Sequence, residues 1–324
     1  MIRRDLLATL AILVAALFVA SLLAGEVAIP LRDLFGGGQT AGGLILRELR
    51  LPRAILAVLV GGTLGLCGAA MQGLLRNPLA EPGVLGVSGC AAVGAVLAFY
   101  FGWAAAFPLL LPVGGIIGAL LAVALLYALA GGAGLLTLLL AGAALNSLAG
   151  ALIALLLNLA PSPYAIYEVL FWLMGSLTDR SMAQVGLALP GILLGGALLL
   201  GTRRALDALS LGEDAARSLG FSLGAVRLRL VLGSALAVGA AVAVSGAIGF
   251  VGLVVPHLMR PLAGRLPGAV LLPSALAGAA LLLAADLAVR LIPTATELRL
   301  GVLTSLIGAP FFILLVLRMR RQEL

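Results

Sequence analysis

The sequence of 324 residues contains no lysine, one histidine and two cysteines. All 20 basic residues are therefore arginines, which excludes a phosphate-binding P-loop and Schiff-base chemistry, because both need a lysine amine. His257 has no second histidine and no carboxylate cluster beside it, so we expect a structural side chain and not a metal or haem ligand. Cys67 and Cys90 lack CxxC spacing, which favours small core residues. We expect no cofactor in this chain.

Charged residues are also scarce. They make up 10% of the chain, against 63% hydrophobic residues and a mean hydropathy of +1.23, whereas soluble domains carry about 25% charged residues. This composition excludes an ordinary water-soluble enzyme. It predicts a single membrane domain over residues 1–324, surrounded by lipid, since no stretch is polar enough for a separate soluble domain. The net charge of +7 indicates membrane topology and not nucleic-acid binding, because cytoplasmic loops attract arginine.

Apolar runs separated by helix breakers are abundant. They predict an all-α polytopic membrane protein with about ten spanning helices, at 6–25, 53–73, 84–103, 109–130, 135–159, 185–202, 226–246, near 248–259, 269–290 and 300–317. The first run is longer than the core of a signal peptide, which favours a retained helix. Most arginines then fall on the side of the two termini, which predicts that both termini are cytoplasmic. A shorter apolar piece at 169–177 predicts a partial helix.

Glycine is frequent, with 43 residues. Many recur with three residues between them, as in the pairs Gly61/Gly65 and Gly114/Gly118. In lipid this spacing lets helix backbones approach closely. We therefore expect tight helix packing through small residues.

The least helix-like stretch beside the membrane lies at 72–90. The pairs Asn77-Pro78 and Glu81-Pro82 each break a helix, because a residue before proline avoids the α conformation. Irregular backbone at membrane depth is tolerated where protein buries it or where it lines a water-filled cavity. The segment is therefore a candidate gate or pore mouth, and the alternative is a plain cytoplasmic turn.

The most polar stretch lies at 205–217, between the sixth and seventh spans. We expect Ser210 to cap a short helix, with Glu213 and Asp214 in its first turn and Gly220 at its end. Such a helix on the cytoplasmic side suits contact with a partner protein, and the alternative is a helix lying on lipid headgroups. The residues expected to make the contact are Leu211, Gly212, Glu213, Asp214, Ala215, Ala216, Leu219 and Gly220.

Arg50, Arg53 and Arg290 lie at the outer ends of predicted spans. They either snorkel to the membrane surface or form an external cationic ring for the carboxylates of a partner, since a guanidinium binds carboxylate with two parallel hydrogen bonds. Asp286 precedes Arg290 by four residues, so we expect the two to pair on one helix face.

Other polar residues are few. Asn146 and Ser147, in the fifth span, suit either hydrogen bonds between helices or a constriction in a pathway. Glu168 and Asp179 fall in an outer region beside Tyr164, where we expect them to be solvated.

Five segments together carry a family resemblance. They are RLPRAILAVLVGGTLGLCGAAMQGLLRNPLAEPGVLGVSGCA at 50–91, FWLMGSL at 171–177, LSLGEDAARSLGFS at 209–222, SGAIGFVGLVVPHLMR at 245–260 and ELRLGVLTSLIGAPFFILLV at 297–316. In this order and spacing they resemble the FecCD-type permeases, the membrane subunits of type II ABC importers for ferric siderophores, haem and vitamin B12. The resemblance covers essentially the whole chain.

The resemblance implies a homodimer with one central pathway in a bacterial inner membrane, two cytoplasmic ATPase subunits that hold ATP and Mg²⁺, and a periplasmic binding protein. It also implies that 209–222, between spans six and seven, forms short cytoplasmic coupling helices that dock on the ATPase. It further implies that the fifth helix lines the pathway, and that arginines matching Arg50, Arg53 and Arg290 meet glutamates of the binding protein. One departure is Arg299, where the family usually has proline; it concerns the turn before the last helix.

Three functions compete on this sequence. The first is an ATP-driven importer permease that moves an intact chelate, with ferric siderophore first and haem or cobalamin next, and that performs no enzymatic step itself. The second is an ion-coupled secondary transporter, which often places ionisable residues at the membrane midplane, whereas the charges here are mostly terminal. The third is a lipid-modifying membrane enzyme, which needs a cluster of Asp, His or Lys that the sequence lacks.

Overall fold

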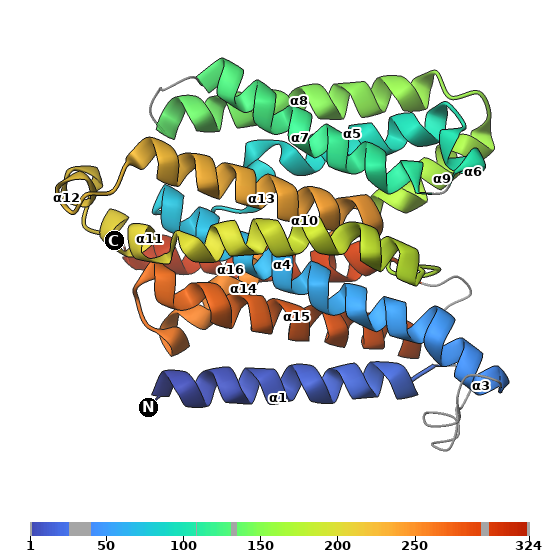
Figure 1. The fold of residues 1–324 in the computed structure, drawn as a ribbon, viewed down its shortest axis with the longest axis horizontal. Coiled ribbons are helices and arrows are strands. Elements are labelled where there is room, and N and C mark those ends of the chain that lie inside the picture. Colours follow the sequence, from blue (N-terminus) through green and yellow to red (C-terminus); the bar gives the residue numbers. More distant parts are fainter. Residues whose placement is uncertain (1, 26–39, 108, 131–134, 293–297, 323–324) are drawn as a thin grey trace.

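The computed structural model describes residues 2–25, 40–107, 109–130, 135–292 and 298–322. Within these ranges the chain is a bundle of helices without strands (Figure 1). The longer helices are α1 (Ile2–Leu23), α4 (Leu51–Leu75), α5 (Val87–Tyr100), α7 (Leu110–Ala130), α8 (Leu135–Asn158), α10 (Met182–Gly201), α13 (Leu223–Ser245), α14 (Val251–Ala263), α15 (Pro267–Leu291) and α16 (Leu300–Gln322). The shorter ones are α3 (Ala41–Leu44), η1 (Ile45–Arg50), η2 (Pro82–Leu85), α6 (Trp103–Ala106), α9 (Pro163–Leu173), α11 (Arg203–Leu209) and α12 (Glu213–Ser218).

Ten apolar helices coincide with the ten predicted spans. In the described part of the chain, seven are long and apolar enough to cross a membrane: α1, the continuous helix of α3, η1 and α4, α7, α8, α10, α13 and α15. The other three, α5, α14 and the apolar part of α16, are shorter. The chain is therefore an all-α polytopic membrane protein.

The bundle has two distinct ends (Figure 1). The start of α1, the end of α16 and the short helices α11 and α12 lie together at one end, here called the α12 end. The helices α3, α6 and α9 lie at the opposite end, here called the α9 end. The two described termini therefore lie at the same end of the bundle.

The partial helix expected at 169–177 begins earlier than the apolar run. Helix α9 starts at Pro163, because Ser162 caps it by accepting a hydrogen bond from the Ala165 backbone N–H at 3.2 Å. The helix ends at Leu173, since the next residues turn through Gly175 with a φ of 73°. The Ser176 N–H then donates to the Ser245 carbonyl at 2.7 Å and ties this turn to the end of α13.

Small residues bring the central helices into backbone contact, as the glycine spacing predicted. Helix α4 packs against α15 where Gly61 faces Gly278 and Gly65 faces Ser274. A Cβ atom at Gly61 or Gly65 would overlap the carbonyl oxygen opposite it. In lipid, helix association depends on such close van der Waals packing. Helix α4 is accordingly among the most buried helices of the bundle.

Candidate functional site

A buried ion-pair cluster joins α4 to α15 at the α9 end. Arg53 Nε lies 2.8 Å from Asp286 Oδ1, and Arg290 Nη2 lies 2.8 Å from Asp286 Oδ2. The Asp286 side chain is only 1% exposed, and those of Arg53 and Arg290 are 13% and 9% exposed. The predicted pairing of Asp286 with Arg290 is confirmed. Arg53 adds a second cation to the same carboxylate, which sequence reasoning missed.

Two arginines also hold the end of α1. Arg50 Nη1 donates to the carbonyl oxygens of Leu22 and Leu23 at 3.0 and 2.9 Å. Arg290 Nη1 donates to the Ser21 carbonyl oxygen at 2.9 Å. The last carbonyl groups of a helix have no partner within the helix and carry its negative dipole end, so cations suit this position. The three arginines thus connect α1, α4 and α15.

The surroundings of these arginines differ from both sequence interpretations. A solvent-facing ring and snorkelling side chains each place the guanidinium groups in water. The structure instead buries Arg50 and bonds all three side chains within the chain. A role of the three residues in docking a partner stays a prediction.

The segment between α4 and α5 is irregular, as predicted. Helix α4 ends at Leu75, and Arg76 follows with a left-handed backbone and a φ of 47°. Asn77 then folds the chain back by accepting a hydrogen bond from the Leu79 N–H on Oδ1 at 2.9 Å. Glu81 is extended and Pro82 starts η2, as the preference of the residue before proline requires. Burial raises the pKa of the Glu81 carboxyl above its usual value.

The last part of this irregular segment packs against α8. Gly86, with a φ of 73°, lies so close to α8 that a Cβ atom there would be 2.8 Å from the Gly142 carbonyl oxygen. A Cβ atom at Gly89 would be 2.9 Å from Asn146 Oδ1. The structure therefore brings two of the predicted gate elements together. Asn146 and Ser147 are both exposed on the single chain, and their gate role stays a prediction.

A polar contact between α4 and α14 was not predicted. The buried Gln72 donates through Nε2 to the Leu253 carbonyl oxygen at 3.2 Å and accepts from Arg260 Nη2 on Oε1 at 2.9 Å. Beside it, a cavity of about 230 Å³ at the α12 end is also lined by Arg76 and Arg265. Gln72 lies at the start of the irregular segment, so this contact holds the α4 end of the segment against α14.

The polar stretch forms two short helices, α11 and α12, between α10 and α13, where short helices were predicted. Ser210 ends α11 and does not cap α12, because its Oγ donates to the Asp207 carbonyl oxygen at 2.6 Å. Gly212, with a φ of 112°, precedes α12 and provides no side-chain cap. On α11, the Asp207 carboxylate accepts a hydrogen bond from the Gly268 backbone N–H at 2.7 Å. Helix α11 thus provides a carboxylate to the first turn of α15.

Helix α12 has one ion pair to α13 and another within itself. Arg227 Nη2 of α13 lies 2.7 Å from Glu213 Oε1. On the outer surface Arg217 pairs with Asp214 at 2.8 Å. Gly220 follows the helix with a φ of 86°, which confirms its predicted place at the helix end.

Several of the residues predicted for this contact lie on one exposed surface. Leu211 and Leu219 are 72% and 61% exposed, and the Asp214 side chain is almost fully exposed. Ala216 faces inward and is fully buried. Two large apolar side chains therefore lie exposed beside the charged residues of α12, and their role in docking a partner stays a prediction.

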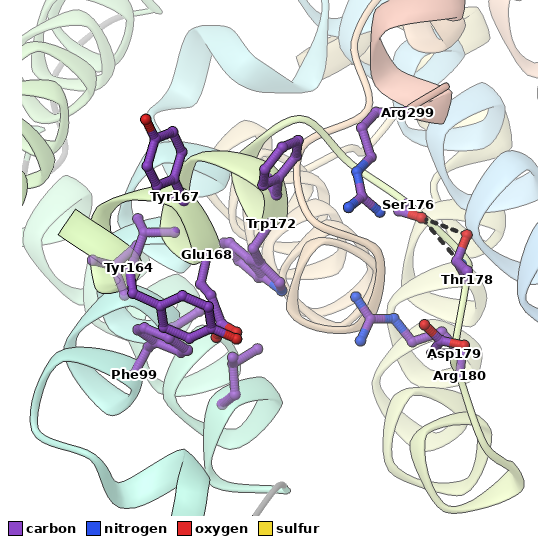
Figure 2. A pocket seen from close by; sticks show the side chains of 15 residues that line it. Phe99, Tyr164, Tyr167, Glu168, Trp172, Ser176, Thr178, Asp179, Arg180 and Arg299 are labelled. Carbon is purple, nitrogen blue, oxygen red and sulfur yellow. Dashed lines mark hydrogen bonds between the residues drawn. The ribbon is translucent and has the colours of Figure 1, made fainter. Parts of the chain in front are cut away.

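A cavity of about 410 Å³ opens at the α9 end (Figure 2). One wall consists of aromatic side chains from α5 and α9, and Figure 2 shows Phe99, Tyr164, Tyr167 and Trp172 there. The other wall is the turn after α9 and the residue before α16. From it Arg180 and Arg299 point their guanidinium groups into the space between.

Local structure positions the two arginines. Arg180 lies directly before Ser181, the residue that caps α10, and Asp179 turns the chain there with a φ of 56°. Arg299 Cζ lies 5.0 Å from the centroid of the Phe171 ring, a distance that suits a cation–π contact. This residue replaces the proline expected from the resemblance; Glu297 lies outside the described residues.

The two acidic residues of this region differ. Asp179 is exposed, which confirms the expected solvation. Glu168 is half-buried and lines the cavity, so it is less exposed than Asp179. Its carboxylate raises the pKa of the Tyr164 hydroxyl, mainly through a hydrogen bond between the two side chains. Helix α9 places Tyr164 and Glu168 on the same wall of the cavity. The sequence of residues 161–180 alone did not predict this arrangement.

Comparisons with known proteins agree with this architecture. The FecCD transport family matches residues 12–318. The hemin transport system permease HmuU of Yersinia pestis is 40% identical, over 99% of this chain and 97% of its own length. The Fe(3+) dicitrate transport system permease FecD of Escherichia coli is 39% identical, over 93% and 94%.

A solved structure shares the fold. It is a candidate metal-chelate type ABC transporter in an inward-facing conformation, with a TM-score of 0.88 and 33% identity, covering 97% of this chain and 99% of the other. The relatives in this family are transport subunits and not enzymes, and ATP hydrolysis belongs to a separate subunit. The chain therefore belongs to the FecCD transport family of ABC-importer permeases.

Proposed function

We propose that this chain is the membrane subunit of an importer that moves an intact metal chelate, with ferric siderophore first and haem or cobalamin next, by alternating access. The family membership carries the proposal. Its relatives are named for hemin and for Fe(3+) dicitrate, both of which are chelates. The chain would lie in the bacterial inner membrane with the α12 end in the cytoplasm, since arginines concentrate at that end.

Two copies would enclose the pathway. Helix α8 is apolar, yet Asn146 and Ser147 lie exposed on it. Polar side chains facing hydrocarbon are costly, and they usually face the bundle interior or a water-filled cavity. A second copy that packs across α8 would place both residues along a shared pathway, next to the irregular segment that precedes α5.

The competing ion-coupled mechanism finds less support. Such a transporter needs a buried ionisable residue that can bind a proton or a cation. The most buried carboxylate in the described part of the chain, Asp286, is already paired with Arg53 and Arg290. Two positive charges at one carboxylate leave little attraction for a further cation.

Transport separates the two mechanisms. The chain, a candidate ATPase and a candidate binding protein are reconstituted in proteoliposomes, and uptake of ferric dicitrate, haemin and cobalamin is measured. We expect uptake of at least one chelate that requires ATP and the binding protein. Uptake driven by an ion gradient without ATP would support the ion-coupled mechanism instead.

The exposed surface of α12 would receive the ATPase. We expect Leu219→Glu to weaken association with the ATPase by about tenfold or more, because burying a leucine contributes about 1.5–3 kcal/mol and the glutamate would bring an unpaired charge into the contact. Pull-down of the ATPase and uptake into proteoliposomes measure the two consequences.

The matched control is Leu219→Met, which keeps an apolar side chain of similar size. Its association should stay close to that of the wild type. Equal ATPase association for Leu219→Glu and Leu219→Met would mean that this surface lies against lipid headgroups or water and not against the ATPase.

The α9 end would receive the binding protein. We expect Arg53→Gln to weaken its docking at low salt by about 1.4- to fivefold, because a charge pair at an interface rim contributes about 0.2–1 kcal/mol, while Asp286 keeps Arg290 as its partner. Docking is measured at low and high salt. Arg265→Gln, an exposed arginine near the α12 end, is the control. Docking that is unchanged at low salt would remove Arg53 from the docking surface.

A further inference from the structure

The cavity at the α9 end contains hydrogen-bond donors that the chain itself does not pair. Trp172 Nε1, Arg180 Nε and Arg299 Nε are buried and have no hydrogen-bond acceptor among the described residues. All three residues line the same cavity. Buried donors in proteins are almost always paired, and each exception calls for an explanation. Three such donors around one space indicate a cavity suited to a ligand rich in acceptor oxygens.

The arginine side of the cavity favours an anionic group. Figure 2 shows Arg180, from the turn after α9, and Arg299, from the residue before α16, pointing into the same space. Burial lowers the pKa of the Arg180 guanidinium, and the nearby Arg299 charge lowers it further, while Asp179 opposes the effect. Asp179 is exposed, and Glu168 lies on the opposite wall beside Tyr164. The lining therefore holds two guanidinium groups and two carboxylates, with both guanidinium groups on one side and the Glu168 carboxylate on the other. The planar shape of the guanidinium groups matches a carboxylate.

The size and the opposite wall favour a small molecule over a protein side chain. Pockets for small ligands measure about 300–1,000 Å³ and combine apolar and aromatic walls with a few polar groups. The volume here, about 410 Å³, lies in that range and is far larger than one acidic side chain of a partner protein requires. The rings of Phe99, Tyr167 and Trp172 provide a wall for an apolar or flat body.

We propose that this cavity binds a metal chelate through free carboxylate groups, held by Arg180, Arg299 and the Trp172 N–H, with the body of the chelate against the aromatic wall. This inference rests on the proposed import function and narrows its substrate class. It favours iron complexes of hydroxycarboxylates and haem, which carry free carboxylates. It disfavours corrinoids, whose ring edge carries carboxamides.

Equilibrium binding to the full chain in nanodiscs tests the proposal, with radioiron-labelled ferric dicitrate, haemin and labelled cobalamin as probes. We expect at least one of the two carboxylate chelates to bind and cobalamin to bind far less. Arg180→Gln and Arg299→Gln should each weaken that binding by about 10- to 100-fold. Trp172→Phe keeps the ring but loses the N–H, and should weaken it by about three- to tenfold. Arg299→Lys keeps the charge without the planar fork and should lie between wild type and Arg299→Gln.

The control is Arg47→Gln, which removes an exposed arginine at the same end but outside the cavity, and should bind like the wild type. Several results would overturn the proposal: binding that is unchanged in both arginine variants, no binding of either carboxylate chelate, or cobalamin binding with the same dependence on the arginines. Iron-free citrate that binds as tightly as ferric dicitrate would overturn the assignment of a metal chelate.

An uptake assay with the ATPase and the binding protein present distinguishes this proposal from the importer function on which it rests. If wild type and both arginine variants import a chelate equally well, the cavity proposal fails and the importer stands. If wild type imports no chelate at all, the importer function fails. If the arginine variants lose the binding protein instead of the chelate, the cavity is a protein contact and the proposal is wrong.

Discussion

Asp286→Ala should be among the most destabilising single substitutions in this chain. It removes the carboxylate that Arg53 and Arg290 share, and both guanidinium groups are largely buried. Removing one partner of a buried ion pair costs about 3–5 kcal/mol, because an uncompensated charge remains. That is a large part of the stability of a typical protein, about 5–15 kcal/mol. Thermal unfolding in detergent and the yield of monodisperse permease measure the effect.

Two further variants separate burial of charge from loss of contact. Glu48→Ala removes an exposed carboxylate at the same end and should leave thermal unfolding unchanged. Asp286→Leu combined with Arg53→Met should be more stable than Asp286→Ala, since Arg290 keeps its bonds to the carbonyl oxygens of Ser21 and Ala24. Wild-type unfolding of Asp286→Ala would contradict the structural role assigned to the cluster.

Gly68→Ala should also have a large effect. A Cβ atom at Gly68 would overlap the carbonyl oxygen of Gly252 at the start of α14, and backbone cannot move aside as a flexible side chain can. Overpacking of this kind costs about 1–3 kcal/mol and occasionally more. Helix α14 would have to move away from α4, which strains the contact of Gln72 with Arg260. We expect reduced thermal stability and loss of ATP-driven uptake.

Gly62→Ala, on the same helix, provides the comparison. The nearest atom to a Cβ atom there is the Ala275 carbonyl oxygen at 3.4 Å. Alanine is favoured over glycine inside a helix by about 1 kcal/mol, so this variant should unfold at the same or a higher temperature. If both variants behave alike, close backbone packing does not limit this bundle.

Hydropathy and helix breakers predicted most of the fold. The ten apolar helices lie where the runs and breakers indicated, because each apolar run and each breaker acts locally. The prediction that Ser210 caps a short helix was wrong. Serine is a common capping residue, but the Ser210 hydroxyl donates to the carbonyl oxygen of Asp207 instead. The helix begins after Gly212 instead. A capping residue can close one helix as well as open the next, and composition does not distinguish the two.

Contacts between distant residues could not be predicted in the same way. Arg53 and Asp286 are separated by 233 positions, and no periodicity specifies the register of one helix against another. The acceptors of Arg50 are backbone carbonyl groups, which every residue has. The cavity at the α9 end combines Arg180 with Arg299, and only the packed bundle brings them to one wall.

The attachment of α1 has a consequence for how the chain is made. Few residues of α1 are buried along its length, and its last turn is held by Arg50 and Arg290. Arg50 follows α1 closely in synthesis, but Arg290 lies 269 positions after Ser21 and leaves the ribosome near the end. The end of α1 can therefore be held by Arg50 as soon as α4 is made, whereas its bonds to Arg290 can form only after α15 has been synthesised. The attachment of α1 is thus completed in two steps separated by most of the bundle.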